Sequence, residues 1–336
     1  MGYLAHLDGL IDPGILEASI HGPLSRYDGH IWRIGWYPLP MPGYYNNDLF
    51  DLAKLNADAP PRTWDELLTA FEALKTAGVD PFGGGVQDGY WAELYITHGL
   101  SQNLVSVGDA VNLFIGDKDF RDPRNHQHWT KLAELRDAGF LNKDMASLEL
   151  YSGIDLCVNG KLGMCSSIGT RLPADAKTTG GRIGCLTLPV FGQGKLAGMP
   201  VVDMQGFGIS AKSEAPEAAA KFLNFLNAPE QLKSFWDATG WIPAASGFDD
   251  SVITDPSVKD LWTRWGKAAS ITNITNLMPG QFYEQAAIPT GQSIISPGMS
   301  GDEAGELAAR VAKEWREFNP DLVETYQKWA AELSAA

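Results

Sequence analysis

Carboxylates are the most numerous side chains in this sequence that could carry out chemistry. Asp and Glu together number 41 among 336 residues, and the net charge is −15. A pair such as Glu93 and Asp203 could act as acid and base in glycoside hydrolysis, which depends on the distance between the two carboxyl groups. The sequence does not give that distance, and scattered acids in so acidic a chain are usually solvated surface groups. The carboxylates by themselves therefore do not indicate an enzyme.

The spacings of cysteine and histidine predict no metal centre and no disulfide framework. Cys157, Cys165 and Cys185 match no zinc pattern, and an odd count does not form a complete set of disulfides. We expect these cysteines to be small buried apolar side chains. His126 and His128 flank a single glutamine, so on a helix they would point to different faces and would not share an ion.

Motifs for nucleotide binding and for nucleophilic catalysis are absent from the sequence. The chain has no G-x-S-x-G, H-E-x-x-H, Walker or G-x-G-x-x-G pattern in the required context. The glycine-bearing stretches FGGGV (82–86) and GFGIS (206–210) open no helix with the spacing that cradles phosphates, so we predict no cofactor. The net charge of −15 argues against a nucleic-acid partner, because no basic patch offsets the acidic residues.

Tryptophan is more frequent than usual, with eleven residues in the chain. An indole ring can stack on a flat apolar face, so the excess is a mild indication of aromatic side chains that bind a ligand. Core packing accounts for most tryptophans in most proteins, and no single one is assigned a role on this basis.

The elements that must position these residues follow an α/β pattern. A chain of 336 residues exceeds the size at which a single core usually stops growing, so two lobes are expected. The clearest helix covers residues 63–78, where Thr63 and Glu66 form a capping box and Gly78 stands at the C-terminal position. Strands alternate with helices along the chain, and no clear linker separates the lobes. We therefore expect lobes that are joined by several chain crossings.

Strands are expected at residues 31–37, 162–165 and 201–213, the last interrupted by two glycines. The stretch PLPMPG, residues 38–43, is interpreted as a loop because prolines do not pair in the interior of a sheet. Residues 215–239 are predicted to form two helices, each begun by Pro-Glu, and the last hundred residues are predicted to be helical. The sequence has no apolar run of eighteen residues that could span a membrane, and its first ten residues show no export signal.

Five stretches occur in one order: YYNNDLF, APPRTWDELLTAFEALKTAG, NGKLGM, GISAKSEAPEAAAKFLNFLNAPEQLKSFWDATGWIPA and a late helical tail. This series, in register over residues 30–330, resembles the family 1 extracellular solute-binding proteins, which are sugar-binding components of ABC importers related to maltose-binding protein. The resemblance implies a two-lobe, periplasmic-binding-protein-like (type II) α/β fold whose lobes close by a hinge motion on a ligand between them. It also implies a membrane permease as partner and a periplasmic or extracellular location.

The resemblance implies a site in which aromatic platforms face the apolar side of a sugar and polar groups bind its hydroxyls. Aromatic rings are expected before the first chain crossing, at a helix start and after a third crossing. A carboxylate and an amide are expected at the return crossing, and Trp241 either at the rim of the cleft or packed behind it. Arg171 stands where relatives often carry an aromatic residue, and it could bind hydroxyls or an acidic group. The ligand-binding residues so implied are Trp36, Tyr37, Tyr90, Trp91, Arg171, Asp203, Gln205, Gly206, Trp241, Phe282 and Tyr283.

The resemblance also implies how the chain divides between the lobes. Residues 1–38 with 206–276 would form the N-terminal lobe, and residues 39–205 with 277–336 the C-terminal lobe. In relatives, roughly 80 to 100 residues precede the stretch GYLAHLDGL, and without their strands the first lobe would have open sheet edges that favour dimerisation. We therefore expect an N-terminally truncated form whose first lobe is incomplete.

Three functions remain open from the sequence. The leading one is a sugar- or oligosaccharide-binding protein that performs no chemistry. The second is a glycoside-active enzyme on a similar two-lobe plan, and the third is a truncated interaction protein that dimerises without binding a ligand. The sequence does not name the sugar, and Arg171 leaves an acidic sugar open.

Overall fold

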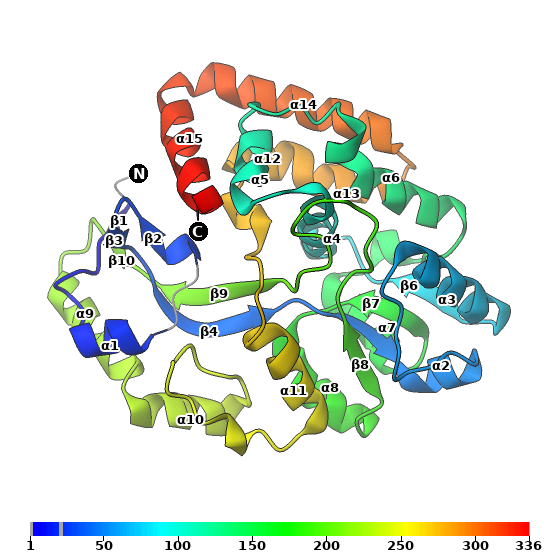
Figure 1. Ribbon diagram of the computed structural model, residues 1–336, viewed down its shortest axis with the longest axis horizontal. Coiled ribbons are helices and arrows are strands. Elements are labelled where there is room, and N and C mark those ends of the chain that lie inside the picture. Colours follow the sequence, from blue (N-terminus) through cyan, green and yellow to red (C-terminus); the bar gives the residue numbers. More distant parts are fainter. Residues whose placement is uncertain (1–2, 20–22, 336) are drawn as a thin grey trace.

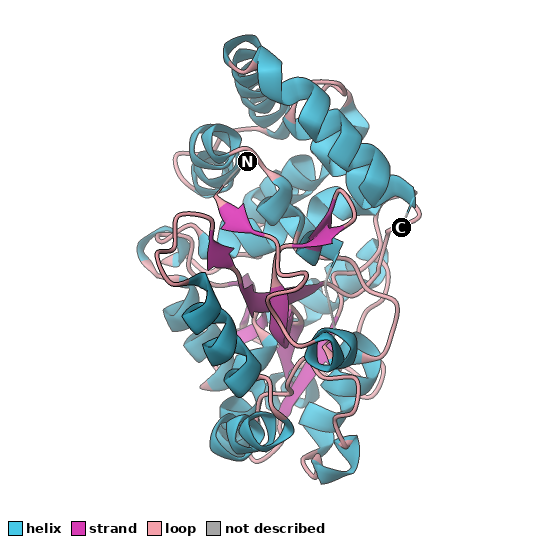
Figure 2. Ribbon diagram, turned by 90° about the vertical axis from the view of Figure 1, so that its left-hand side faces the viewer, coloured by secondary structure: helices cyan, strands magenta, loops and turns pink. Residues whose placement is uncertain are grey.

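The computed structural model describes residues 3–19 and 23–335, and Figure 1 labels its elements. Helices and strands alternate up to residue 210, and only helices and turns follow in the described residues. Figure 2 shows the strands in the interior of the molecule with helices around them. The α/β class predicted from the sequence is therefore confirmed.

The elements have the following bounds. The strands are β1 Leu4–Ala5, β2 Arg26–Tyr27, β3 His30–Ile31, β4 Ile34–Pro40, β5 Gly43–Asn46, β6 Asp80–Gly83, β7 Leu162–Ser166, β8 Ile183–Leu186, β9 Val202–Phe207 and β10 Ile209–Ser210. The α-helices are α1 Pro13–Ala18, α2 Asn47–Leu52, α3 Trp64–Thr76, α4 Tyr90–Leu100, α5 Val107–Phe114, α6 Pro123–Asp137, α7 Leu150–Val158, α8 Leu172–Thr179, α9 Pro216–Leu226, α10 Pro229–Thr239, α11 Pro256–Leu261, α12 Gly280–Phe282, α13 Ile288–Ile295, α14 Gly301–Phe318 and α15 Pro320–Ala335.

Local sequence explains where several helices begin and end. Thr63 and Glu66 form the predicted capping box at the start of α3. Helices α9 and α10 each begin with proline, and α10 ends at Gly240 in the left-handed conformation, as predicted. Among the described residues, no helix combines the length and apolar character needed to cross a membrane.

A four-stranded sheet has the strand order β6-β7-β5-β8. Strands β6 and β7 are parallel, whereas β5 is antiparallel to both β7 and β8. Helix α3 packs against β6, and α7 packs against β7. All five residues of β7 are buried, which confirms the predicted short buried strand.

Strands β4 and β9 form a two-stranded antiparallel ribbon that runs across the middle of the molecule in Figure 1. The sequence predicted a loop from residue 38 onward, but Pro38 and Pro40 pair with Met204 and Val202 in this ribbon. That prediction was wrong because each strand of a two-stranded ribbon is an edge strand, and an edge strand tolerates proline where its nitrogen faces away from the partner.

The ribbon joins two hydrophobic clusters. The smaller cluster includes Ile34 of β4 and Ile209 of β10, and the larger one includes Met41, directly after β4, and surrounds the four-stranded sheet. On the return strand, Val202 packs against the larger cluster. The ribbon therefore carries the chain from one hydrophobic cluster to the other and back.

The smaller cluster brings together the short strand pairs β1–β10 and β2–β3 with helices α1 and α9, on the left of Figure 1. Its buried members are Leu7, Ile11, Ile31, Ile34, Ile209, Ala220 and Leu223. The lobe boundaries predicted from the sequence stay a prediction. Buried side chains from Ile253 to Ile274, a segment that this prediction assigned to the N-terminal lobe, pack into the larger cluster.

Candidate functional site

Glu93, in the first turn of α4, accepts three side-chain hydrogen bonds. Asn273 Nδ2 and Thr275 Oγ1 donate to Oε1 over 2.7 and 3.0 Å, and Tyr283 Oη donates to Oε2 over 3.0 Å. Helix α4 starts at Tyr90 because Gly89, at φ +81°, turns the chain in a conformation that other residues rarely adopt. Glu93 therefore ties the start of α4 to the segment that carries residues 273–283.

Asp203 lies on β9 and is buried, with 3% of its surface exposed. Its oxygens accept hydrogen bonds from Met204 N at 2.9 Å, Gln205 Nε2 at 2.7 Å and Asn276 Nδ2 at 3.1 Å. Burial raises the pKa of Asp203, and the charge of Glu93 raises it further. Glu93 and Asp203, whose distance the sequence did not give, are therefore close enough in the folded chain for the charge of one to affect the pKa of the other.

A short 3-10 helix, Ile274–Leu277, positions the groups that bind the two carboxylates. Asn273 caps it, since its Oδ1 accepts from Thr275 N at 3.1 Å. The cap leaves Asn273 Nδ2 and Thr275 Oγ1 directed to Glu93, while Asn276 donates to Asp203. One turn of chain thus connects both carboxylates.

Two tyrosines lie beside these carboxylates, Tyr283 beside Glu93 and Tyr37 beside Asp203, and two more, Tyr90 and Tyr151, lie near those two rings. Burial raises the pKa of Tyr283, and the nearby Glu93 and Tyr90 raise it further. Burial also raises the pKa of Tyr37, as do the nearby Tyr151 and Asp203. Tyr37 and Tyr283 are half-buried, whereas Tyr90 and Tyr151 are 55% and 51% exposed. The rings therefore extend from the carboxylates to the surface.

Arg33 adds a guanidinium beside Asp203. Its Nη2 donates to the backbone oxygen of Met204 over 2.6 Å, and its charge lowers the pKa of Asp203 against the effect of burial. The buried Nε of Arg33 has no hydrogen-bond partner among the described residues. We call this group the tyrosine–carboxylate cluster: Arg33, Tyr37, Tyr90, Glu93, Tyr151, Asp203, Gln205, Asn276 and Tyr283.

The cluster has the chemistry of a site for a polyhydroxylated ligand. Tyrosine rings offer flat apolar faces with polar tips, and carboxylate and amide oxygens accept hydrogen bonds from hydroxyls. Gln205 is half-buried and lies beside the buried Asp203, so an acceptor and a donor are available together. Such a combination can hold a sugar ring without covalent chemistry.

Trp36, Tyr37 and Trp241, all predicted to bind ligand, lie in one aromatic group with Phe235 of α10. Ring centroids of Tyr37 and Trp241 are 5.0 Å apart, and those of Trp36 and Phe235 are 4.9 Å apart. Trp241 Nε1 donates to the backbone oxygen of Thr170 over 3.0 Å. Half-buried Trp241 therefore packs against Tyr37, and a contact of Trp36 or Trp241 with a ligand stays a prediction.

Trp91 and Phe282, also predicted to bind ligand, lie in the core. Trp91 is 0% exposed, stacks on Tyr95 with centroids 5.2 Å apart, and donates from Nε1 to Gly83 O over 2.9 Å. Phe282 is 1% exposed and packs against Phe114 and Phe120. We therefore leave both residues out of the candidate site, because their rings present no surface to a ligand.

Arg171 is already paired within the protein. Its guanidinium binds Asp175 over 2.9 Å and Asp155 over 2.6 Å, and it lies over the ring of Tyr151. Two carboxylates neutralise its charge, so the structure offers no free guanidinium here for an acidic sugar. Arg171 instead supports Tyr151, a residue that the sequence did not single out.

Gly206, the last of the predicted residues, has a packing role. A Cβ at this position would lie 2.1 Å from the backbone oxygen of Ile34, across the β4–β9 ribbon. Gly206→Ala is therefore expected to lower the free energy of unfolding by about 1–3 kcal/mol, since the two strands would have to separate. Urea unfolding followed by tryptophan fluorescence measures this change.

Gly247→Ala is the control for that variant, because a Cβ there meets no atom within 4 Å. We expect it to change the free energy of unfolding by no more than about 0.5–1 kcal/mol, and in the stabilising direction. An equal decrease in the free energy of unfolding in both variants would contradict the packing role of Gly206.

Sequence reasoning missed Arg33, Tyr151, Asn273, Thr275 and Asn276. The run Asn273-Ile274-Thr275-Asn276 carries a local indication, because an asparagine two residues before a threonine can cap a turn. Its partners lie 73 to 182 residues away in the chain. Local pattern therefore could indicate the turn but not the carboxylates that it binds.

The three cysteines are buried, as the sequence predicted, and two of the histidines, His126 and His128, lie in different surroundings. Cys157, Cys165 and Cys185 are buried and free. His126 Nδ1 contacts the backbone oxygen of Phe120 and Nε2 contacts Asp302, whereas His128 is enclosed in the core. The two histidines therefore have different surroundings and share no ligand position.

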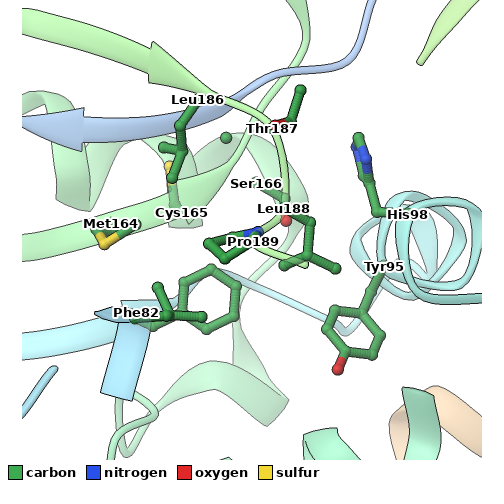
Figure 3. A pocket seen from close by; sticks show the side chains of 12 residues that line it. Phe82, Tyr95, His98, Met164, Cys165, Ser166, Leu186, Thr187, Leu188 and Pro189 are labelled. Atoms are coloured by element: carbon green, nitrogen blue, oxygen red, sulfur yellow. The ribbon is translucent and has the colours of Figure 1, made fainter. Parts of the chain in front are cut away.

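Two cavities lie outside the residues of the cluster. One of about 600 Å³ lies between α1, α10 and residues 243–252, with Trp236 and Phe248 in its wall. Asp12 and Lys233 in its lining are engaged locally, since Asp12 caps α1 and Lys233 pairs with Asp237. A second cavity, of about 30 Å³, is lined by residues such as Phe82, Tyr95 and His98 (Figure 3). The first is lined by none of the predicted ligand-binding residues, and the second is too small for a sugar.

Comparison with known proteins decides the family. Residues 1–233 match the family described as bacterial extracellular solute-binding protein. This chain belongs to that family. The match confirms the resemblance found in the five sequence stretches.

Curated relatives of this solute-binding protein include the sn-glycerol-3-phosphate-binding periplasmic protein UgpB of Salmonella typhimurium. It is 25% identical over 216 residues, which cover 60% of this chain and 46% of the relative. The UgpB protein of Rhizobium meliloti is 26% identical over 206 residues with the same coverage. The chain thus spans about half the length of the curated relatives it matches.

Solved structures confirm the two-lobe fold class. A chitin oligosaccharide binding protein has a TM-score of 0.81 at 20% identity, covering 93% of this chain and 79% of that one. A family 1 extracellular solute-binding protein from Bifidobacterium longum subsp. infantis has a TM-score of 0.71 at 20% identity, covering 92% and 80%. A sugar transporter from Bacillus licheniformis, in complex with stachyose, has a TM-score of 0.71 at 17% identity, covering 92% and 80%.

Proposed function

We propose that this solute-binding protein binds a neutral sugar or oligosaccharide at the tyrosine–carboxylate cluster and delivers it to an ABC-type permease. Family membership and the sugar ligands named for its structural neighbours support the ligand class. The observation that supports the proposal is the position of Tyr283 beside Glu93 and of Tyr37 beside Asp203, with Tyr90 and Tyr151 near these two rings. The family description supports a location outside the cytoplasmic membrane.

The charge of the cluster favours a neutral ligand over a phosphorylated one. The cluster contains two carboxylates and one guanidinium, Arg33, and Arg171 nearby is already neutralised by two aspartates. Phosphate recognition requires several unshared cationic or amide donors. Although curated relatives are named for sn-glycerol 3-phosphate, we infer that this chain prefers a ligand without a phosphate.

The β4–β9 ribbon is the element through which we expect the protein to close on its ligand. It joins the two hydrophobic clusters, and Gln205 on β9 pairs with Tyr37 on β4 within it. Bending of a two-stranded connection moves packed bodies relative to each other with little change in either. Ligand contacts on the ribbon and on α4 would then tighten together.

Binding without chemistry fits the way in which the carboxylates are engaged. Glu93 and Asp203 each accept three hydrogen bonds, so each is already held as an acceptor rather than poised to transfer a proton. Overnight incubation with an oligosaccharide, followed by thin-layer chromatography, distinguishes this proposal from the glycoside-active alternative. Shortened products would favour the enzyme.

Dimerisation of this chain through open strand edges stays a prediction. The pairs β1–β10 and β2–β3 are each two-stranded in the described part of the chain. Size-exclusion chromatography with light scattering measures the mass in solution, and a monomer would contradict the dimer.

Tyr283→Ala is expected to weaken binding of a neutral oligosaccharide by about 1–3 kcal/mol, or roughly 5- to 150-fold, because a stacking ring is lost. A thermal-shift screen against neutral oligosaccharides and sn-glycerol 3-phosphate first identifies the ligand. Titration calorimetry then compares the affinities of the variants. Tyr283→Phe keeps the ring and loses only the hydrogen bond to Glu93, so it should retain most of the affinity.

Tyr326→Ala provides the matched control for the tyrosine variant. Tyr326 is half-buried on α15 and packs against Trp315 and Trp329, away from the cluster. Its loss should leave the dissociation constant unchanged. If the Tyr283→Ala variant and the unchanged protein bind the ligand with equal affinity, Tyr283 is not part of the site. If the screen finds only sn-glycerol 3-phosphate as a ligand, the proposal of a neutral ligand is contradicted.

A further inference from the structure

His6, Asp8 and His30 form a compact group of potential metal ligands on the smaller hydrophobic cluster. Their donor atoms all lie within 4.8 Å of one another, and all three side chains are exposed. The Nδ1 atoms of His6 and His30 lie 3.7 and 3.2 Å from the same oxygen, Asp8 Oδ2. The tyrosine–carboxylate cluster uses none of these three residues.

The scaffold presents the three donors on one face. Leu7 and Ile31 are buried between them, so the neighbouring side chains of His6, Asp8 and His30 point outward. Leu7 N donates to Ile31 O over 2.6 Å, which fixes the two chain segments side by side. Ile31 N also donates to Asp8 Oδ2 over 3.1 Å and holds this carboxylate in position.

Trp32 supports both imidazole rings from one side. Its ring lies edge-on to His6 at 5.8 Å and to His30 at 6.2 Å between centroids. The indole is itself held, since Nε1 donates to the backbone oxygen of Tyr27 over 2.9 Å. The two imidazoles are therefore placed by packing as well as by their contacts with Asp8, and an indole lies within reach as an optical reporter.

Two of the donor separations are close to those around a tetrahedral ion. Nitrogen and carboxylate ligands bind Zn²⁺ at about 2.0–2.2 Å, and a tetrahedron with such bonds has donor atoms roughly 3.3–3.6 Å apart. The separations of 3.2 and 3.7 Å from Asp8 Oδ2 lie just outside the two ends of this range, and all the donors lie within 4.8 Å of one another. A small adjustment of exposed side chains would bring all three donors onto one ion.

We propose that His6, Asp8 and His30 form a binding site for a divalent transition-metal ion, with Zn²⁺ as the ion best suited to it. Transition-metal ions bind well to a set of two imidazoles and one carboxylate. Ca²⁺ and Mg²⁺ instead take oxygen ligands and fit this set less well. Three protein ligands leave a fourth coordination position for water or for a donor from another molecule. The site is separate from sugar binding and does not depend on it.

The test uses the full chain without a histidine tag, freed of metal by a chelator and then titrated with Zn²⁺ against a chromophoric competitor. One Zn²⁺ per chain is expected. His6→Gln and His30→Gln should each weaken binding by about tenfold or more, since each removes one ligand. Titration with Co²⁺ gives a second readout, because a tetrahedral site produces strong visible absorption and should quench the fluorescence of Trp32.

Asp58→Asn is the control, because it removes an exposed potential ligand that the proposal does not use. Thermal unfolding in the presence of chelator shows whether each variant is folded, which separates a lost ligand from a lost fold. The proposal is overturned by the absence of stoichiometric Zn²⁺ binding, by unchanged affinity in the folded His6→Gln and His30→Gln variants, or by an equal loss in Asp58→Asn.

Discussion

Trp91→Ala is expected to lower the free energy of unfolding by about 3–5 kcal/mol, the range for removal of a large aromatic side chain from a core. The ring is fully buried, stacks on Tyr95 with an interplanar angle of 8° and contacts Phe82 at 5.9 Å. Its removal leaves a cavity and an unpaired carbonyl at Gly83. Urea unfolding, with circular dichroism as the readout, measures the shift in midpoint.

The adjacent residue supplies the control for Trp91. Tyr90→Ala removes an aromatic ring that is 55% exposed, so the free energy of unfolding should change by no more than about 0.5 kcal/mol. Trp91→Phe, which keeps an aromatic ring but loses the hydrogen bond to Gly83, should be intermediate. A Trp91→Ala protein with unchanged stability and weakened sugar binding would return Trp91 to the ligand site.

Acidification is expected to destabilise the protein through two buried histidines. Burial lowers the pKa of His98 to about 4, against a backbone hydrogen bond that raises it, and burial together with the charge of His126 lowers the pKa of His128 to about 3. Both values lie below the unfolded value near 6.5. As the pH falls below 6.5, the unfolded chain takes up these protons first, and stability is lost progressively down to the folded pKa values.

The size of this loss of stability follows from the pKa shifts of His98 and His128. At about pH 4.5 each imidazole should have lowered the free energy of unfolding by roughly 2–3 kcal/mol relative to pH 7. His98 lies beside the enclosed cavity of Figure 3, and His128 Nε2 is buried without a partner among the described residues. Urea unfolding at pH 7 and near pH 4.5 measures the difference for the unchanged chain.

Variants separate the two histidines from the many carboxylates that also titrate. His98→Gln removes one titrating group, so the difference in stability between the two pH values should shrink by roughly 2–3 kcal/mol. Gly247→Ala, which removes no titrating group and whose Cβ meets no atom within 4 Å, should leave that difference unchanged. The same pH dependence in all three proteins would mean that His98 is not the buried neutral group inferred from the structure.

Neighbouring residues of α4 thus have different expected roles, some in ligand binding at the tyrosine–carboxylate cluster and others in the stability of the core. Tyr90 and Glu93 face the cluster, whereas Trp91 and Tyr95 face the core. Helical periodicity separates these two faces, since residues three apart lie on one side of a helix. Substitutions at Tyr90 and Glu93 should therefore affect affinity, whereas substitutions at Trp91 and Tyr95 should affect stability.

The sequence by itself determined the local elements and the family. The capping box at Thr63, the prolines that begin α9 and α10, and Gly240 at the end of α10 were all read correctly. Each rests on hydrogen bonds or steric limits within a few residues, which the sequence displays directly. The order of five stretches indicated the solute-binding family because they recur together along the chain.

Only the tertiary structure decided which residues meet and which are buried. Trp91 and Tyr90 are adjacent and both aromatic, yet one is in the core and the other is exposed. Pro38 lies in a strand because β9, more than 160 residues later, pairs with it. Glu93 and Thr275 bind across 182 residues of chain. Burial and such contacts depend on partners that no local pattern encodes, so the candidate site emerged only when the folded chain brought them together.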